Sequence, residues 1–218
     1  MLLYLGLFLL NSFINNNFRQ VNISNIHAIY TFIFSLLHLN GFSLVVNNYV
    51  DLMVYSIFYS VYDIYYLLKK KIRGYQSLIV HHSLIIYAVI FAKLYFNSKD
   101  KIINLMALNY LTEISTPFFN KSFDLAEQKK ENTYEYKLIN TLVIIIFGLS
   151  RVLMIPYLFY NSLYLGKNII ICQTILSTMN VVWYYKICKY YKKNILNNNV
   201  KNILNNNVKN ILNNNVKN

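Results

Sequence analysis

Long apolar blocks separated by short polar segments form the main pattern of this chain. Six blocks are each about twenty residues long, the length at which an α-helix crosses a bilayer. They cover residues 24–46, 49–68, 77–96, 102–119, 137–160 and 168–191. A backbone in lipid must satisfy its own hydrogen bonds, so each block is predicted to be a membrane-spanning helix.

The two ends of the chain differ from these blocks. Residues 1–10 are apolar but short, and they lack the basic start and cleavage site of a secretory signal. We expect a shortened helix or an interfacial anchor there, followed by a polar loop to residue 23. The unit NILNNNVK occurs three times within residues 194–217, and its many Asn residues bury little apolar area. Residues 192–218 are therefore predicted to be a disordered, low-complexity tail, and residues 24–191 a single transmembrane domain.

Composition supports an all-α, polytopic membrane bundle. Hydrophobic residues make up 56% of the chain, which is high for a soluble domain. A net charge of +13 would suggest nucleic acid in a soluble protein. Here the basic residues lie between apolar blocks, where positive charge sets orientation, so no nucleic-acid partner is predicted. Cys172 and Cys188 form no metal-ligand pattern and imply no disulfide framework.

The distribution of basic residues predicts how the helices are oriented. With six spans, the side that holds both termini carries sixteen of the 21 Lys and Arg residues. The opposite side carries three, which are Lys99, Lys101 and Lys167. Because positive residues collect on the cytoplasmic side, both termini are predicted to be cytoplasmic.

Ionisable residues inside the apolar blocks are the first candidate functional residues, because such groups are costly in lipid. At about 1.5 Å per residue, His27, Asp63 and the pair His81 and His82 lie about 5–8 Å inside the cytoplasmic ends of their helices. Glu113 lies about 9 Å inside the fourth helix. We therefore predict one polar layer, near the cytoplasmic face, to which four helices contribute. Arg151 and Asn180 are expected nearer the midplane, on the fifth and sixth helices.

Each of these residues also has a simpler interpretation. His27 could lie in the membrane interface, and Asp63 could be a structural partner of nearby tyrosines. Glu113 could serve only to pair with Arg151, which is unfavourable unpaired in a membrane. The His pair is harder to explain in this way. Adjacent side chains on a helix point about 100° apart, so both rings cannot easily face lipid.

These residue types suggest acid–base or acyl-transfer chemistry. An imidazole beside a carboxylate is a general acid–base pair, and a histidine can also accept an acyl group. Zinc is disfavoured because adjacent His residues lack the usual ligand spacing, so no metal or cofactor is predicted. The candidate catalytic residues are His81, His82 and Glu113. The predicted lipid pocket adds His27, Asp63, Asn109, Arg151 and Asn180.

The order of motifs resembles the TLC-domain family of multi-pass membrane proteins, which includes ceramide synthases. The segments that carry the resemblance are IHAIYTFIFSLL, YSVYDIYYLL, LIVHHSLIIYA, LNYLTEISTPFFN, FGLSRVLMIPYLFY and MNVVWYYKI. They extend over residues 26–187, and the likeness is greatest to small family members of poorly defined function. The resemblance implies a helical bundle around a lipid-accommodating cavity, in the endoplasmic reticulum or a related membrane.

The resemblance also assigns residues. His81 and His82 match the family's His pair, and Glu113 matches the acid of the small members. The other positions that fall on motifs are Asp63, Arg151, Asn180 and Trp183. One departure matters: ceramide synthases follow their His pair with a His-Asp-x-x-Asp motif on the next helix, where this chain reads ALNYLTEIS.

Three functions are open at the level of sequence. The first is binding or handling of membrane lipids, whether sphingolipid, fatty-acyl or phospholipid, with an effect on membrane composition or lipid traffic. The second is a ceramide-synthase-like N-acyltransferase that uses acyl-CoA, against which the missing acidic motif counts. The third, a transporter or channel, is disfavoured because the sequence has no inverted repeat. The sequence identifies neither the lipid nor a protein partner.

Overall fold

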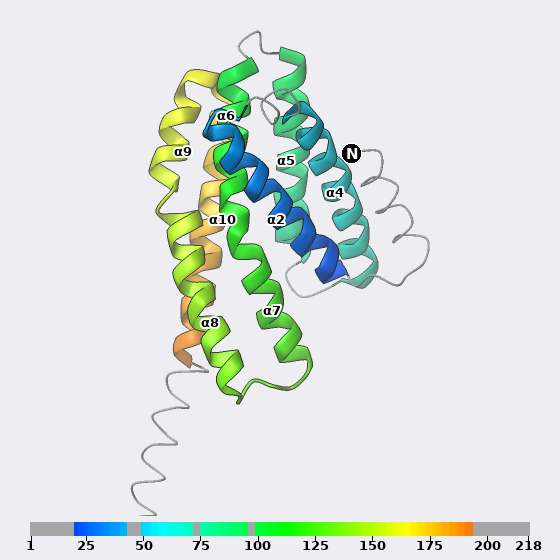
Figure 1. The fold of residues 1–218 in the computed structure, drawn as a ribbon, viewed down its shortest axis with the longest axis vertical. Helices are drawn as coiled ribbons and strands as arrows, with labels where there is room; N and C mark the ends of the chain where they lie inside the picture. Colours follow the sequence, from blue (N-terminus) through cyan, green and yellow to red (C-terminus); the bar gives the residue numbers. More distant parts are fainter. Residues whose placement is uncertain (1–19, 43–48, 72–74, 96–98, 194–218) are drawn as a thin grey trace, which may run out of the picture.

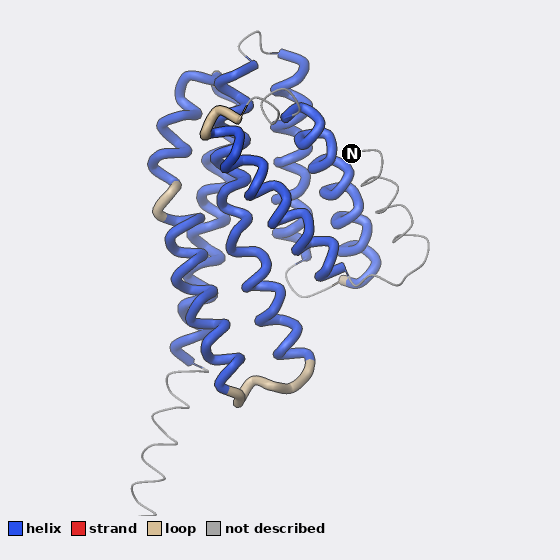
Figure 2. The backbone as a smooth tube through the Cα atoms, viewed as in Figure 1, coloured by secondary structure: helices blue, strands red, loops and turns tan. Residues whose placement is uncertain are grey.

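The computed structural model describes residues 20–42, 49–71, 75–95 and 99–193, and every regular element within them is helical (Figures 1 and 2). This confirms the predicted all-α class. The apolar segment 1–10 and the repeats of residues 194–217 lie outside the described residues, so the expectations for them stay predictions.

Six helical rods follow one another along the described chain. The first three are α2 (Gln20–Leu39), α4 (Tyr49–Lys70) and α5 (Tyr75–Tyr95). The fourth joins α6 (Lys99–Leu111), the 3-10 turn η1 (Thr112–Ser115) and α7 (Thr116–Glu127). The fifth joins α8 (Tyr134–Phe147), the π-helical turn η2 (Gly148–Val152), α9 (Ile155–Ser162) and the 3-10 turn η3 (Leu163–Leu165). The sixth is α10 (Lys167–Tyr191).

The rods correspond in order to the six apolar blocks, and their ends differ most at α7. The predicted fourth block ends at residue 119, whereas α7 continues to Glu127. The extension is amphipathic, so a search for continuous apolar sequence misses it. Its buried Leu125 packs with Tyr136 of α8, which holds the two helices together beyond the apolar block.

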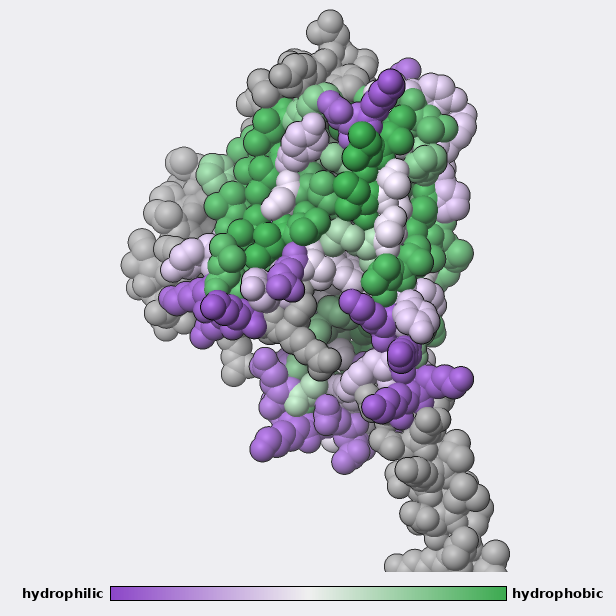
Figure 3. Space-filling view, turned by 180° about the vertical axis from the view of Figure 1, so that it is seen from behind, coloured by the Kyte–Doolittle hydropathy of each residue, from purple (hydrophilic) through white to green (hydrophobic). Residues whose placement is uncertain are grey.

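Neighbouring rods run up and down, and the ends rich in basic residues gather at one end of the bundle (Figure 1). The end of α4, the α7–α8 loop and the end of α10 all lie at the lower end in this view. Figure 3 shows hydrophilic side chains concentrated at the same end and apolar side chains above them. The fold thus brings together the basic segments that the sequence placed on one side.

The bundle exposes apolar side chains and buries polar ones. Phe58 of α4 and Leu153 are each 68% exposed, and large apolar side chains on α2, α8, α9 and α10 are exposed as well. In contrast, Thr31 and Ser35 of α2 and Ser56 of α4 are fully buried. Soluble proteins ordinarily show the opposite preference for small hydroxyl residues, which are mostly exposed.

By length and composition, one helix in the described residues could cross a membrane. It is the 32-residue segment Tyr134–Leu165, and 22% of its most apolar stretch is buried inside the protein. Tyr75–Phe91 is apolar but shorter. Tyr, Ser and Asn lower the hydropathy of the remaining rods. One of the six predicted spans therefore meets this criterion, and the multi-pass arrangement stays a prediction.

Candidate functional site

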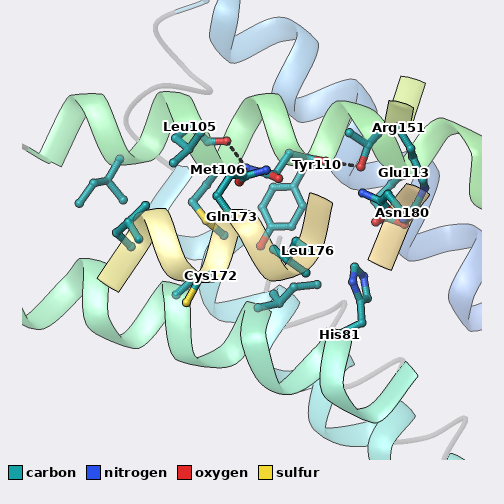
Figure 4. Close-up of a pocket in the computed structure, with 16 residues that line it drawn as sticks. His81, Leu105, Met106, Tyr110, Glu113, Arg151, Cys172, Gln173, Leu176 and Asn180 are labelled. Atoms are coloured by element: carbon teal, nitrogen blue, oxygen red, sulfur yellow. Dashed lines mark hydrogen bonds and ion pairs between the residues drawn. The ribbon is translucent and has the colours of Figure 1, made fainter. Parts of the chain in front are cut away.

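A cavity lies between α5, α6 and α10, with η1 and η2 closing one end (Figure 4). Glu113, Arg151 and Asn180 lie together at that end, and Leu105 and Met106 lie toward the other. The centre of a water molecule can occupy about 50 Å³ within it. This is room for roughly four water molecules. The cavity is therefore small, with a polar end and a largely apolar remainder.

A buried ion pair forms the polar end of the cavity. Arg151 Nη2 lies 3.2 Å from Glu113 Oε2, and the side chains are 7% and 14% exposed. Arg151 also donates hydrogen bonds to Ser115 Oγ at 2.8 Å and to Thr116 Oγ1 at 3.1 Å. The Thr116 hydroxyl in turn donates to Glu113 at 2.7 Å. Such additional hydrogen bonds are what a buried ion pair needs to offset the desolvation of its charges.

Two irregular helical turns make this pairing possible. In η2 the amide of Leu153 donates to the carbonyl of Gly148 at 2.9 Å, a step of five residues instead of four. The additional residue shifts the side chains around the helix axis by about 100°. The η1 turn opposite it ends just before Pro117, which lacks the amide needed to continue a regular hydrogen-bond ladder. Such π-helical turns are frequent at functional sites.

The second histidine of the pair binds an acid. His82 Nε2 lies 2.7 Å from Asp63 Oδ2, and both side chains are buried. The carboxylate accepts this hydrogen bond, so a neutral His82 carries its proton on Nε2 and leaves Nδ1 as an acceptor. Within the described part of the chain, that buried Nδ1 has no hydrogen-bond partner. The arrangement is a carboxylate-oriented imidazole, which is the geometry of a base.

His81 connects this pair to the cavity. Its ring centroid lies 5.3 Å from that of His82 and 5.5 Å from that of Trp183 on α10, edge-on in both cases. His81 itself lines the cavity. The two adjacent histidines thus have different surroundings, as the 100° separation predicts, and both rings face the interior.

His27 lies in an aromatic layer beside the cavity. Its ring stacks on Tyr59 at a centroid distance of 3.8 Å, and its Nε2 lies 3.3 Å from Ser56 Oγ. Tyr59 also meets the His82 ring edge-on at 5.7 Å. His27 is 5% exposed, so its side chain faces the interior of the bundle, and its depth in a membrane stays a prediction.

The structure divides the predicted residues into two adjoining groups. Those that line the cavity are His81, Asn109, Glu113, Arg151 and Asn180. Those in the buried layer beside it are His27, Asp63 and His82. Arg151 is predicted nearer the midplane, but its long side chain reaches the Glu113 carboxylate, which is the pairing that the sequence offers as an alternative role for Glu113. In the described residues, no group of three or more His, Cys, Asp or Glu side chains could hold a metal ion.

Sequence reasoning missed several partners of these residues. Ser115 and Thr116 bind Arg151, and the signal that could have identified them is the hydroxyl-rich Ser-Thr-Pro step after Glu113. Gln173 accepts a hydrogen bond from Asn109 at 3.2 Å. Nothing in the local sequence of α10 marks this glutamine as buried. Tyr59 belongs to a tyrosine stripe that the sequence suggested to be packing, yet it contacts two of the histidines.

No protein-family model, curated protein or solved structure matches this chain. The resemblance to TLC-domain proteins therefore stays a prediction that depends on the order of motifs in the sequence.

Proposed function

We propose that the chain is a multi-pass, TLC-like membrane protein that binds a membrane lipid in the cavity between α5, α6 and α10. The observation that carries this proposal is the cavity itself, which has a polar end and an apolar remainder. A lipid has the same division between head and chain. A binding or handling function needs no further chemistry, and it would affect lipid composition or traffic in the endoplasmic reticulum or a related membrane.

The distribution of apolar surface supports a membrane location. Large apolar residues such as Phe58, Leu149 and Ile171 are more than half exposed on three different helices. Contiguous apolar surface of this kind is unfavourable in water and favourable in lipid. Two of the buried acids are paired across helices, Asp63 with His82 and Glu113 with Arg151, as charged groups in an environment without water require.

The first test is to identify what co-purifies with the protein. The full chain is extracted in mild detergent, and its bound lipids are measured by mass spectrometry beside the His81→Ala/His82→Ala variant. We expect one lipid class to be enriched over the bulk membrane in the wild type and lost in the variant. The matched control is His38→Ala, because it removes a buried histidine that is bonded to Asn104 and does not line the cavity. Recovery of bulk lipid alone from all three proteins would contradict the proposal.

A second candidate function is acyl transfer. The observation in its favour is the Asp63–His82 pair, which lies against His81 at the cavity wall. A base oriented by a carboxylate could deprotonate an amine that attacks the thioester of acyl-CoA, or His81 could accept the acyl group and pass it to the amine; in both cases the C–S bond breaks and CoA leaves as its thiol. The test is acyl transfer to a long-chain amine by purified wild type and by Asp63→Asn. The absence of product across chain lengths from well-folded wild type would exclude this function.

A further inference from the structure

The charges at the polar end of the cavity compensate each other. Glu113 and Arg151 are the ionised side chains among its lining residues, and they are paired at 3.2 Å. Three of the hydrogen bonds that Arg151 makes go to side chains of the protein. A charged ligand would therefore meet a guanidinium whose charge Glu113 already balances. Burial of an ion without a partner is strongly unfavourable, so this wall disfavours anions and cations alike.

Two other polar side chains at the same end can meet a ligand. Asn180 is 8% exposed, and its Oδ1 is buried without a hydrogen bond in the described residues. His81 makes edge-on ring contacts with His82 and Trp183. Both side chains line the cavity (Figure 4). The Asn180 oxygen needs a donor, and a neutral imidazole offers one donor and one acceptor, so a head group that both donates and accepts hydrogen bonds can satisfy both side chains.

The remainder of the wall limits the size of the ligand. Its lining is mainly apolar and includes Ile85, Ala88, Ile102 and Ile169. The space open to the centre of a water molecule is about 50 Å³. This space, roughly four water molecules, suits a small head and the start of one hydrocarbon chain.

We infer that the cavity selects a neutral, single-chain lipid whose head is a hydroxyl or an amide, held by Asn180 and His81. This inference rests on the proposed lipid-binding function and assigns it a ligand class. Free fatty acids, lysophospholipids and charged amines should bind more weakly, because Glu113 already balances the charge of Arg151.

The test compares four probes with the same oleoyl-type chain and different heads. The full chain in detergent micelles receives equal concentrations of oleyl alcohol, N-oleoylethanolamine, oleic acid and oleoyl lysophosphatidic acid, at a pH where the acid is ionised. Bound probe is measured by native mass spectrometry. We expect the two neutral probes to be bound at least tenfold more than either anion. Equal or stronger binding of an anion would overturn the inference and leave lipid binding intact.

Variants on α10 test the assigned contact. Asn180→Leu keeps the volume of the side chain and removes its amide, and we expect binding of N-oleoylethanolamine to fall at least tenfold. Thr178→Val is the matched control, because Thr178 is exposed on the same helix and outside the cavity. Unchanged binding by Asn180→Leu would overturn the role of Asn180. If Asn180→Leu does not fold, the comparison of neutral and anionic probes on the wild-type protein tests the inference. Binding of no probe by folded wild type would overturn both this inference and the proposed function.

Discussion

Arg151 illustrates how a single residue is held by several elements. Its guanidinium binds Glu113, Ser115 and Thr116 from η1 and α7 and lies over the ring of Phe147, with the guanidinium carbon 5.3 Å from the ring centroid. The residue is buried, so its charge depends on these protein partners. The energetic consequence depends on whether one or both charges are removed.

We expect either single charge removal to destabilise the protein more than the double one. Glu113→Gln leaves a buried guanidinium without its counter-charge, and Arg151→Met leaves a buried carboxylate. Each should lower the free energy of unfolding by about 3–5 kcal/mol. Glu113→Gln/Arg151→Met should lose less than either single variant, because no charge is left unpaired. Unfolding in detergent measures all four proteins. Additive losses in the double variant would mean that the two charges are not coupled.

The Asp63–His82 contact predicts which of two substitutions at Asp63 destabilises the protein more. Asp63→Asn retains an oxygen that can accept the hydrogen bond from His82 Nε2, whereas Asp63→Leu leaves that buried nitrogen without an acceptor. An unsatisfied buried group costs about 1–3 kcal/mol. We therefore expect Asp63→Leu to have the lower melting temperature of the two variants. The reverse order would show that packing at this position outweighs the hydrogen bond.

At the scale of elements, the close approach of α8 and α10 depends on a glycine. A Cβ atom at Gly148 would lie 2.9 Å from the hydroxyl oxygen of Tyr184 and 3.2 Å from the ring carbon that bears it. Gly148 also begins the π-helical turn that presents Arg151. The glycine therefore permits both the helix contact and the turn.

We expect the effect of Gly148→Ala to depend on residue 184. In the wild-type background, overpacking of about 1–3 kcal/mol opposes the gain of replacing a helical glycine. In a Tyr184→Phe background the closest atom is absent, so the same substitution should be more favourable. A double-mutant cycle on unfolding free energies measures the difference. Equal effects of Gly148→Ala in both backgrounds would contradict the predicted clash.

The six helical rods could be predicted from the sequence, whereas the irregular turns η1 and η2 could not. Continuous apolar length predicts the six rods, because burial in lipid or in a bundle favours the same residues. It does not predict η1 or η2, since a 3-10 or π turn arises from which partner a side chain finds across the bundle. The depth estimate grouped His27, Asp63, the His pair and Glu113 from helical rise alone. The cost of an unpaired Arg151 suggested its pairing with Glu113, but nothing in the sequence paired His82 with Asp63, because helix rotation and neighbours are tertiary properties.

At the scale of the whole molecule, the segments rich in basic residues lie toward one end of the bundle, where hydrophilic side chains are concentrated (Figures 1 and 3). Two glycosylation sequons, Asn22-Ile23-Ser24 and Asn120-Lys121-Ser122, also lie on the predicted cytoplasmic side. Asn120 donates hydrogen bonds to Ser24 and Asn25, at 3.1 and 2.7 Å, so folding alone restricts access to it. Asn22 is exposed and is the informative acceptor.

We predict that Asn22 carries no glycan when the chain is expressed in a eukaryotic cell. A cytoplasmic sequon does not meet the glycosylation enzymes, which act in the secretory lumen. The measurement is the mobility of the protein before and after glycosidase treatment. A sequon-bearing tag inserted between residues 43 and 48, on the predicted luminal side, is the positive control. A glycan on Asn22 would show that the N-terminal side is luminal, which is the opposite of the predicted orientation.

The position of Trp183 makes its intrinsic fluorescence sensitive to the surroundings of the cavity. It is the one tryptophan in the sequence, and its ring lies 5.5 Å from that of His81 at the cavity wall. The emission of an indole depends on the polarity and proton state of its surroundings. Red-edge excitation separates this signal from the 21 tyrosines. Binding of a ligand in the cavity could therefore be followed in real time without an added label, by a shift in the fluorescence emission of Trp183.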